Sequence, residues 1–351
     1  MHLQHSQRAP TYIKAIVTPR EPMLRTMSFL LLSILPGTAF AICEGQDLID
    51  AMSAENRAAL QAEAEAMPYP QGLYWQATRG DQTITMFGTY HFRHALTDAH
   101  MELVKPQIAA ADAVFLEMSQ KDQQNFQNAI ATDPGIMFIT EGPTLPDLLG
   151  EDDWAKFKSE METRGFPGVM ASRLKPLWAA MMLGIGPCEA QNGAMEGDGI
   201  DALVGEYAGD IGTPSRSLED FTSVLGMLDG QPMEDQLDMI RLTLGVPLDP
   251  DDMSYTIRER YLSEEIALTW QFAKAVSLQY GGPTAAEDFA FLEKAILVKR
   301  NEDWVDLLAG LEESTVFAAF GAGHLPGTFG VLYLLEQEGY TITRLPVPLP
   351  N

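Results

Sequence analysis

The sequence predicts an α/β (α+β) protein with a mixed central β-sheet that is built from both ends of the chain and flanked by helices. Two observations predict this fold class. Helical patterns dominate from about 148 to 283, so we expect a large helical insertion that covers the sheet. The β-rich segments lie near the two ends of the chain, at 73–78, 83–87, 113–117, 315–320 and 341–345.

The first elements follow from residue patterns and from helix breakers. Residues 46–66 show an amphipathic, Ala/Glu-rich pattern that ends at Pro68 and Pro70, which predicts a helix. The strands 73–78 and 83–87 are separated by Arg-Gly-Asp-Gln, a hairpin signal.

Residues 97–111 then follow a helical pattern in which Pro106 predicts a kink, and 113–117 is a short buried strand that ends in a carboxylate. One further short strand is expected near 215–218. We predict the remaining helices at 151–164, 172–184, 200–208, 220–229, 233–244, 255–276, 284–297, 301–311 and 329–338.

The first 41 residues have the features of a secretory signal peptide. A basic segment around Arg25 precedes the apolar run 28–35, and Ala39-Phe40-Ala41 fits a cleavage site. We therefore expect one domain at 42–351, with its core at about 70–346, in a periplasmic or secreted protein. No other segment approaches 18 uninterrupted apolar residues, so stable membrane insertion is not expected.

Charge and cysteine content narrow the class of protein. The formal net charge of −26 disfavours binding to nucleic acid and to anionic membrane surfaces. Two cysteines occur, Cys43 and Cys188, and an even pair in an exported protein favours a disulfide. The alternative is two unpaired thiols.

Two Gly-x-x-His segments are the most informative motifs. Gly88-Thr89-Tyr90-His91 follows the strand 83–87, and Gly321-Ala322-Gly323-His324 follows the strand 315–320. Open α/β sheets bind ligands beyond the carboxyl ends of their strands, and imidazole is a common metal ligand and acid/base group. We expect His91 and His324 to converge on one site. The alternative is that each is a hydrogen-bonded structural residue.

Other polar residues are candidates for the same site. Glu117 ends a strand one helix after His91, and a strand–helix–strand unit would place the two strands side by side with both residues at one rim. Arg300 opens a predicted helix and could bind a substrate carboxylate or an oxyanion. The alternative for Glu117 is a solvated strand end.

Four further polar residues have weaker assignments. The neighbour of Arg300, Asn301, reads as a helix N-cap with no further role. Asp201 and Glu219 are acids in apolar surroundings, and Asp201 could simply cap a helix. His94, three residues after His91, could add a metal ligand.

These residues resemble the TraB/GumN family, which is related to the Tiki proteases. The resemblance rests on Met86–His91 with Ala110–Glu117, on Pro176–Ala179, on Gly199–Asp201 with Ser217–Glu219, and on Arg300-Asn301-x-x-Trp304 with Gly321–Gly327. It implies an α/β fold. In Tiki-type members it implies a metal-dependent peptidase whose ligands correspond here to His91, Glu117 and His324. The related erythromycin esterases use similar residues for hydrolysis, with a less clear need for metal.

We therefore expect an exported, metal-dependent hydrolase, most like a peptidase, that acts on a peptide or another small amide or ester. A divalent ion such as Zn, Mn or Co, held by His91, His324 and Glu117, would activate a water molecule. If Glu117 is not a ligand, it would be the general base, and Arg300 would stabilise the oxyanion. The alternative is a non-catalytic periplasmic protein that sequesters a peptide or small ligand in the same pocket.

Overall fold

The computed structural model describes residues 43–193 and 199–348, so the predicted signal segment at 1–41 lies outside the described residues. The strands are β1 Tyr74–Arg79, β2 Gln82–Thr89, β3 Ala113–Leu116, β4 Ser215–Ser217, β5 Thr315–Gly321 and β6 Thr341–Arg344. They form one six-stranded mixed sheet in the order β4-β3-β5-β2-β1-β6. The predicted α/β class and the sheet built from both ends are confirmed.

Helices account for most of the rest of the described chain. The α-helices are α1 Ala54–Glu65, α2 Thr97–Ala110, α3 Gln120–Thr132, α4 Leu145–Thr163, α5 Gly168–Ala171, α6 Pro176–Leu183, α7 Pro187–Gln191, α8 Ile200–Ile211, α9 Phe221–Asp229, α10 Met233–Gly245, α11 Pro250–Leu262, α12 Ile266–Tyr280, α13 Ala285–Glu293, α14 Lys299–Ala309 and α15 Val331–Gln337. Short 3₁₀ turns occur at η1 Pro134–Ile136, η2 Gly282–Thr284 and η4 Ala322–His324, and a π-helical segment at η3 Lys294–Val298.

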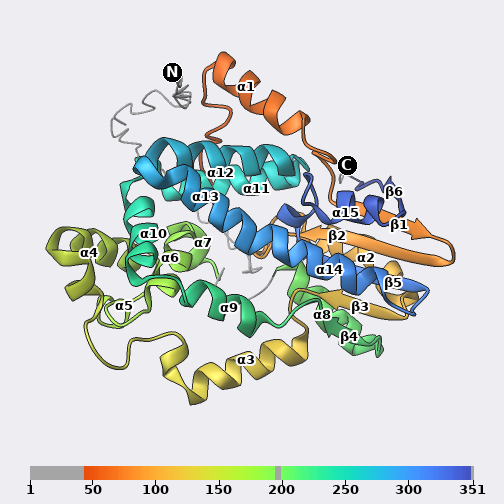
Figure 1. Ribbon diagram of the computed structural model, residues 1–351, viewed down its shortest axis with the longest axis horizontal. Helices are drawn as coiled ribbons and strands as arrows, with labels where there is room; N and C mark the ends of the chain where they lie inside the picture. Colours follow the sequence, from red (N-terminus) through yellow and green to blue (C-terminus); the bar gives the residue numbers. More distant parts are fainter. Residues whose placement is uncertain (1–42, 194–198, 349–351) are drawn as a thin grey trace, which may run out of the picture.

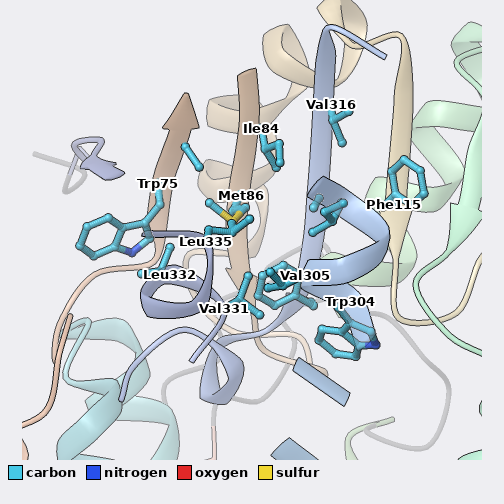
Figure 2. Packing of buried hydrophobic residues seen from close by; sticks show 14 of the residues in the cluster. Trp75, Ile84, Met86, Phe115, Trp304, Val305, Val316, Val331, Leu332 and Leu335 are labelled. Atoms are coloured by element: carbon cyan, nitrogen blue, oxygen red, sulfur yellow. The ribbon is translucent and has the colours of Figure 1, made fainter. Parts of the chain in front are cut away.

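Helices cover both faces of the sheet. On one face, α14 and α15 bury Trp304, Val331 and Leu335 against strand residues such as Met86 and Phe115 (Figure 2). On the other face, α2 and α8 pack against alternate strand residues. The alternation arises because successive side chains of a strand point to opposite faces, so central strands must be apolar throughout.

The three central strands β2, β5 and β3 run parallel, whereas β1 is antiparallel to both β2 and β6. A two-residue turn with Gly80 at φ 58° joins β1 to β2, as the predicted hairpin requires. The register pairs Thr89 with Gly321 and Leu116 with Ala319. The carboxyl ends of all three parallel strands therefore share one rim.

Only part of the predicted helical insertion covers the sheet: α8 packs on one face, whereas another group of its helices lies beside the sheet. Helices α4, α5, α6 and α10 form their own apolar cluster around Phe157, Met161 and Ile240. Figure 1 shows this group at the side of the molecule opposite to β1 and β6. These four helices therefore bury their apolar residues mainly against one another.

Some of the observed helices differ from the predicted ones. The segment expected as one helix at 255–276 is two helices, α11 and α12, because Glu264 adopts φ 61°. Helix α3 was not predicted; it is mostly polar, and none of its residues is buried. The first helix begins only at Ala54, where Ser53 caps its N-terminus.

A disulfide joins Cys43 to Cys188, with the two Cα atoms 5.8 Å apart, and this confirms the predicted pairing. The bond ties the start of the described chain to α7. The nearby Arg258 is buried, donating to the Cys43 carbonyl oxygen at 2.5 Å and to the Glu189 carboxylate at 2.7 Å. Covalent and ionic contacts therefore hold the same junction.

Candidate active site

The site lies at the shared rim of the parallel strands. Glu117 directly follows β3, Gly321 ends β5, and His91 comes two residues after β2. We had expected the two strands that carry His91 and Glu117 to be neighbours. This is wrong, because β5 lies between them. The rim is nevertheless common to both, since all three strands run in the same direction.

Gly321 is the point at which the predicted residues converge. A β-carbon at this glycine would lie 3.2 Å from Glu117 Oε1, 3.5 Å from His91 Nε2 and 3.7 Å from His324 Cδ2. Since the last two distances add to 7.2 Å, these two imidazole atoms can be no further apart than that. The structure thus brings His91, Glu117 and His324 around one small space that glycine leaves open.

His91 is the solvent-facing member of the group, with 58% of its side chain exposed. Its Nδ1 lies 3.4 Å from Asp201 Oδ1, on the first turn of α8. Helix α8 can approach this closely because Gly199, just before it, has no β-carbon; a β-carbon there would lie only 2.3 Å from the His91 carbonyl oxygen. Asp201 therefore does more than cap a helix, since it is positioned to orient the imidazole.

Electrostatics favour the protonated form of His91. Burial of part of the ring acts to lower its pKa, but the Asp201 and Glu117 carboxylates outweigh this and raise the pKa from 6.5 to about 9. Because the side chain is more than half exposed, water screens part of this attraction. An imidazole whose cation is stabilised by a carboxylate is suited to accept and return a proton.

His324 is the buried member, with only 6% of the residue exposed. Its ring packs against Trp304 at a centroid distance of 4.3 Å, with the two planes tilted by 36°, and meets Phe320 edge-on. The glycines before it and the Leu-Pro-Gly segment after it are typical of a loop with little packing, but the residue is enclosed. The 3₁₀ turn η4 folds the side chain back against α14, so its ring is part of the core.

Asn301 fixes the tautomer of His324. Its amide nitrogen donates to the Phe329 carbonyl oxygen at 2.7 Å, so its Oδ1 faces His324 Nδ1 at 2.5 Å and accepts from that N–H. The lone pair of His324 then lies on Nε2, which faces Arg300 Nη1 at 3.3 Å. Burial and the nearby cation lower the pKa of His324 to about 3, against the opposing pull of Glu117.

Asn301 was predicted as an N-cap with no further role, and the structure corrects this. The residue lies inside α14, which follows directly from the π-helical segment, and is 1% exposed. The residue type alone does not distinguish a capping asparagine from a buried one at this position. The signal that could have found it is the spacing of Asn301 and Trp304, which puts both on the helix face that meets His324.

Arg300 links two carboxylates at the centre of the site. Its Nη2 donates to Glu117 Oε2 at 2.6 Å and also to Glu219, which in turn accepts from Nε at 2.9 Å. Its Nη1 faces the Ile296 carbonyl oxygen at 3.2 Å and His324 Nε2. All five N–H groups of the guanidinium thus have protein acceptors, so here Arg300 positions Glu117. Its predicted contact with substrate stays a prediction.

Glu117 is held ionised. Although burial acts to raise its pKa, the neighbouring histidines, Arg300 and the Gly321 N–H lower it to about 2. The Gly321 N–H donates to Oε1 at 2.7 Å. Glu219, flagged in the sequence only as an acid in apolar surroundings, is the second carboxylate of the same network.

The donors do not fit a metal ion in this arrangement. Two imidazoles and a carboxylate are suitable ligand types, but a metal needs their lone pairs directed at one point. Here Arg300 contacts both His324 Nε2 and Glu117 Oε2, and the Gly321 N–H donates to the other oxygen of Glu117. Within residues 43–193 and 199–348, no group of three or more His, Cys, Asp or Glu side chains is arranged to hold a metal.

His94 is not part of this group. Its ring packs against His100 and Tyr261, with centroid distances of 5.2 Å and 5.3 Å. Its Nδ1 accepts from the Leu96 N–H, which closes the turn before α2. The His91–His94 spacing therefore reflects a structural turn and not a chelate.

A cavity of about 310 Å³ adjoins the convergence point, and His91, Glu117 and Asp201 all line it. Ligand sites of small molecules fall in the range of about 300–1,000 Å³. The site therefore combines a proton-exchanging imidazole, an ionised carboxylate and an adjoining space for a substrate group.

In the part of the chain that the structure describes, no helix is both long and apolar enough to cross a bilayer.

Comparison with known proteins is consistent with this site. Over 71 residues the chain is 35% identical to Metalloprotease TIKI2 of Danio rerio, a match that spans 19% of this chain and 14% of the relative. Residues 73–344, which include every site residue described above, match the TraB/PrgY/gumN family. The match extends over most of the chain and covers the whole sheet, and the protein therefore belongs to the TraB/PrgY/gumN family.

Proposed function

We propose that the protein is a hydrolase, most like a peptidase, that cleaves an amide or ester bond of a peptide or related small molecule. One observation carries this proposal: His91, Glu117 and His324 surround the space at Gly321 beside a cavity of substrate size. An imidazole that faces an open space and is backed by a carboxylate is a common arrangement for general acid–base catalysis.

His91 has the central role in this proposal. The step requires the neutral form of His91, whose share grows as the pH rises towards its pKa of about 9. In that form Nε2 takes a proton from the water that attacks the carbonyl carbon, and the resulting imidazolium returns the proton to the leaving nitrogen or oxygen. Asp201 orients the ring and stabilises its charged form. Glu117 adds to this stabilisation, and Arg300 with His324 holds Glu117 in place.

Metal-assisted hydrolysis is a second candidate, which the name Metalloprotease TIKI2 favours. The ligands predicted from the sequence, His91, His324 and Glu117, are the residues that converge. Both His324 and Glu117 contact Arg300, so binding of a divalent ion such as Zn, Mn or Co would require the guanidinium to move.

The test is incubation of the purified protein with a mixed peptide library, with and without a chelator, read by mass spectrometry. We expect new peptide ends with the wild type and none with His91→Ala. Arg93→Ala is the matched control, because Arg93 lies in the same loop and pairs with Asp98. Loss of cleavage on chelation, together with metal in the purified protein, would select the metal-assisted form.

Sequestration without turnover is the competing function. It predicts that one peptide per chain is retained and recovered intact, and that retention survives the chelator. That result would contradict the hydrolase proposal.

We also propose that the chain is exported to the periplasm or secreted, with cleavage after Ala41. The Cys43–Cys188 disulfide supports this, since such bonds persist in oxidising compartments. The intact mass of protein recovered outside the cytoplasm should correspond to a chain that starts at Ile42 and has no free thiol. A chain recovered only in the cytoplasm with two free thiols would contradict export.

A further inference from the structure

The cavity beside the site differs in character from the site itself. Away from His91, Glu117 and Asp201, its walls carry no formal charge. Leu116 ends β3, and Met118 lies two residues after that strand. Met181 comes from α6, and Ala202 and Gly205 come from α8. The remaining polar groups are the neutral side chains of Gln120 and Gln123.

The charges at the polar end are already compensated. Glu117 binds Arg300 and the Gly321 N–H, and Asp201 pairs with His91. A charged substrate group that entered the cavity would lose its hydration without gaining a free counter-charge, which is costly. An uncharged group would meet no such penalty.

Methionine shapes the apolar part. Met181 is 46% exposed although it is a large apolar residue, and a substrate group in the cavity would cover part of that surface. Because methionine is flexible and polarizable, a wall that contains Met118 and Met181 can adapt to apolar groups of several shapes.

Gly205 sets how far the cavity extends towards β3. This buried residue has helical neighbours in α8, and a β-carbon there would lie 3.2 Å from Leu116 Cδ1. A larger side chain at 205 would therefore occupy space that is now open. One turn later, Gly209 has a similar close neighbour, Gln120 Oε1 at 3.3 Å, but is not among the residues that line the cavity.

We propose that this cavity is a specificity subsite that binds an uncharged, mainly apolar side chain of a peptide, next to the bond that is cleaved. The inference rests on the proposed hydrolase function. At about 310 Å³ the cavity lies at the small end of the range for ligand sites, which matches one side chain better than a large ligand.

The experiment uses quenched fluorescent peptides that differ at one position, with Met, Leu, Asp or Lys there. Cleavage is measured by fluorescence, and binding is measured in parallel by anisotropy. We expect kcat/KM for the Met and Leu peptides to exceed that for the Asp and Lys peptides at least about tenfold, since even one methylene is worth about 10–200-fold.

Two variant pairs test the assignment. Met181→Lys should lower kcat/KM for the Met peptide about tenfold and raise that for the Asp peptide, whereas Met170→Lys, with Met170 at a similar 45% exposure, should change neither. Gly205→Leu should lower kcat/KM and weaken binding for all apolar peptides. Gly209→Leu, which gains the same helix propensity, should change neither.

The outcomes separate the subsite from the hydrolase function. If peptides are cleaved but Met, Leu, Asp and Lys are equivalent, or if Met181→Lys leaves the preference unchanged, the subsite is wrong and the hydrolase stands. If nothing is cleaved but the Met and Leu peptides bind selectively and Met181→Lys abolishes this, the subsite stands without the hydrolase. Absence of both cleavage and binding would overturn both.

Discussion

The two Gly-x-x-His motifs place chemically opposite histidines at one rim. His91 is mostly exposed and lies beside the carboxylate of Asp201, so its cation is favoured. His324 is buried beside the amide of Asn301 and the cation of Arg300, so its neutral form is favoured. Identical motifs therefore specify position, and the partners from α8 and α14 specify protonation.

The difference in protonation also suits the two histidines to different roles in the site. A histidine that is exposed to a cavity and can change charge suits proton transfer, whereas a neutral, fully bonded histidine suits the positioning of its neighbours. Paired groups whose surroundings push their pKa values apart are typical of acid–base centres. Each prediction below tests whether the two histidines really differ in this way.

The largest effect is expected from His91→Ala. General acid–base groups contribute about 10²–10⁴-fold in rate, so kcat/KM should fall by that factor. The thermal midpoint should change little, because 58% of the side chain is already exposed. The measurement pairs turnover with thermal unfolding.

His324→Ala supplies the contrast to that variant. We expect it to lower turnover too, but with a loss of about 1–3 kcal/mol of stability, because Asn301 Oδ1 and the core around Trp304 lose their partner. If His324→Ala were as stable as the wild type, or His91→Ala unfolded early, the contrast between an exposed and a core histidine would fail.

The next effect concerns Arg300, whose Nη1 faces His324 Nε2. Arg300→Ala would leave the carboxylates of Glu117 and Glu219, 19% and 11% exposed, without their common partner. Removing one partner of a buried ion pair costs about 3–5 kcal/mol, and urea unfolding should show a loss of this order.

Arg241→Ala is the matched control for Arg300→Ala. Arg241 also contacts several carboxylates, but Glu234 and Asp238 are 69% and 63% exposed, so its removal should cost no more than about 1 kcal/mol. Equal losses for the two variants would show that the site network does not behave as a buried one.

A third prediction exchanges the partners of the two histidines. Asp201→Asn removes the carboxylate that raises the pKa of His91, so that pKa should fall. Asn301→Asp places a carboxylate at His324 Nδ1, so the pKa of His324 should rise. NMR titration of the histidine ring signals measures both. If neither pKa moved, burial alone and not the partner would govern the protonation states.

The sequence predicted where the strands lie better than what surrounds their ends. Strand residues are buried on both faces and bounded by turns, so β2 and β5 were located to within about two residues from their apolar runs. Their order in the sheet could not be predicted, because β5 is inserted between β2 and β3 from the other end of the chain. That insertion creates the convergence at Gly321.

The partners of the site residues were the weakest part of the prediction. Asp201, Glu219 and Asn301 were all noticed, but as a cap, an unassigned acid and a second cap. Each acquires its role from a contact more than 20 positions away in the sequence: 110 positions for Asp201 with His91, 81 for Glu219 with Arg300, and 23 for Asn301 with His324. Local pattern carries no information on such contacts.

The smallest expected effect is the opposite sign of the two histidines in the pH dependence of stability. For His324 the folded pKa of about 3 lies below the unfolded value of 6.5, so the unfolded state binds more protons between them. Its contribution is therefore lost as the pH falls below 6.5. Burial lowers the pKa of His94 to about 3 and that of His100 to about 4, so both add to the loss of stability at acid pH, the acid limb of the stability profile.

His91 should act in the other direction. Its folded pKa of about 9 lies above 6.5, so its stabilising contribution is complete below 6.5 and is lost as the pH rises towards 9. Urea unfolding of the wild type and of His91→Gln between pH 4.5 and 9 tests this, and the range stays above the usual pKa of carboxyl groups. The variant should flatten only the alkaline limb, and only slightly, because solvent screens an exposed pair. If it flattened the acid limb instead, His91 would be held neutral like His324, and the division of roles between the two motifs would be lost.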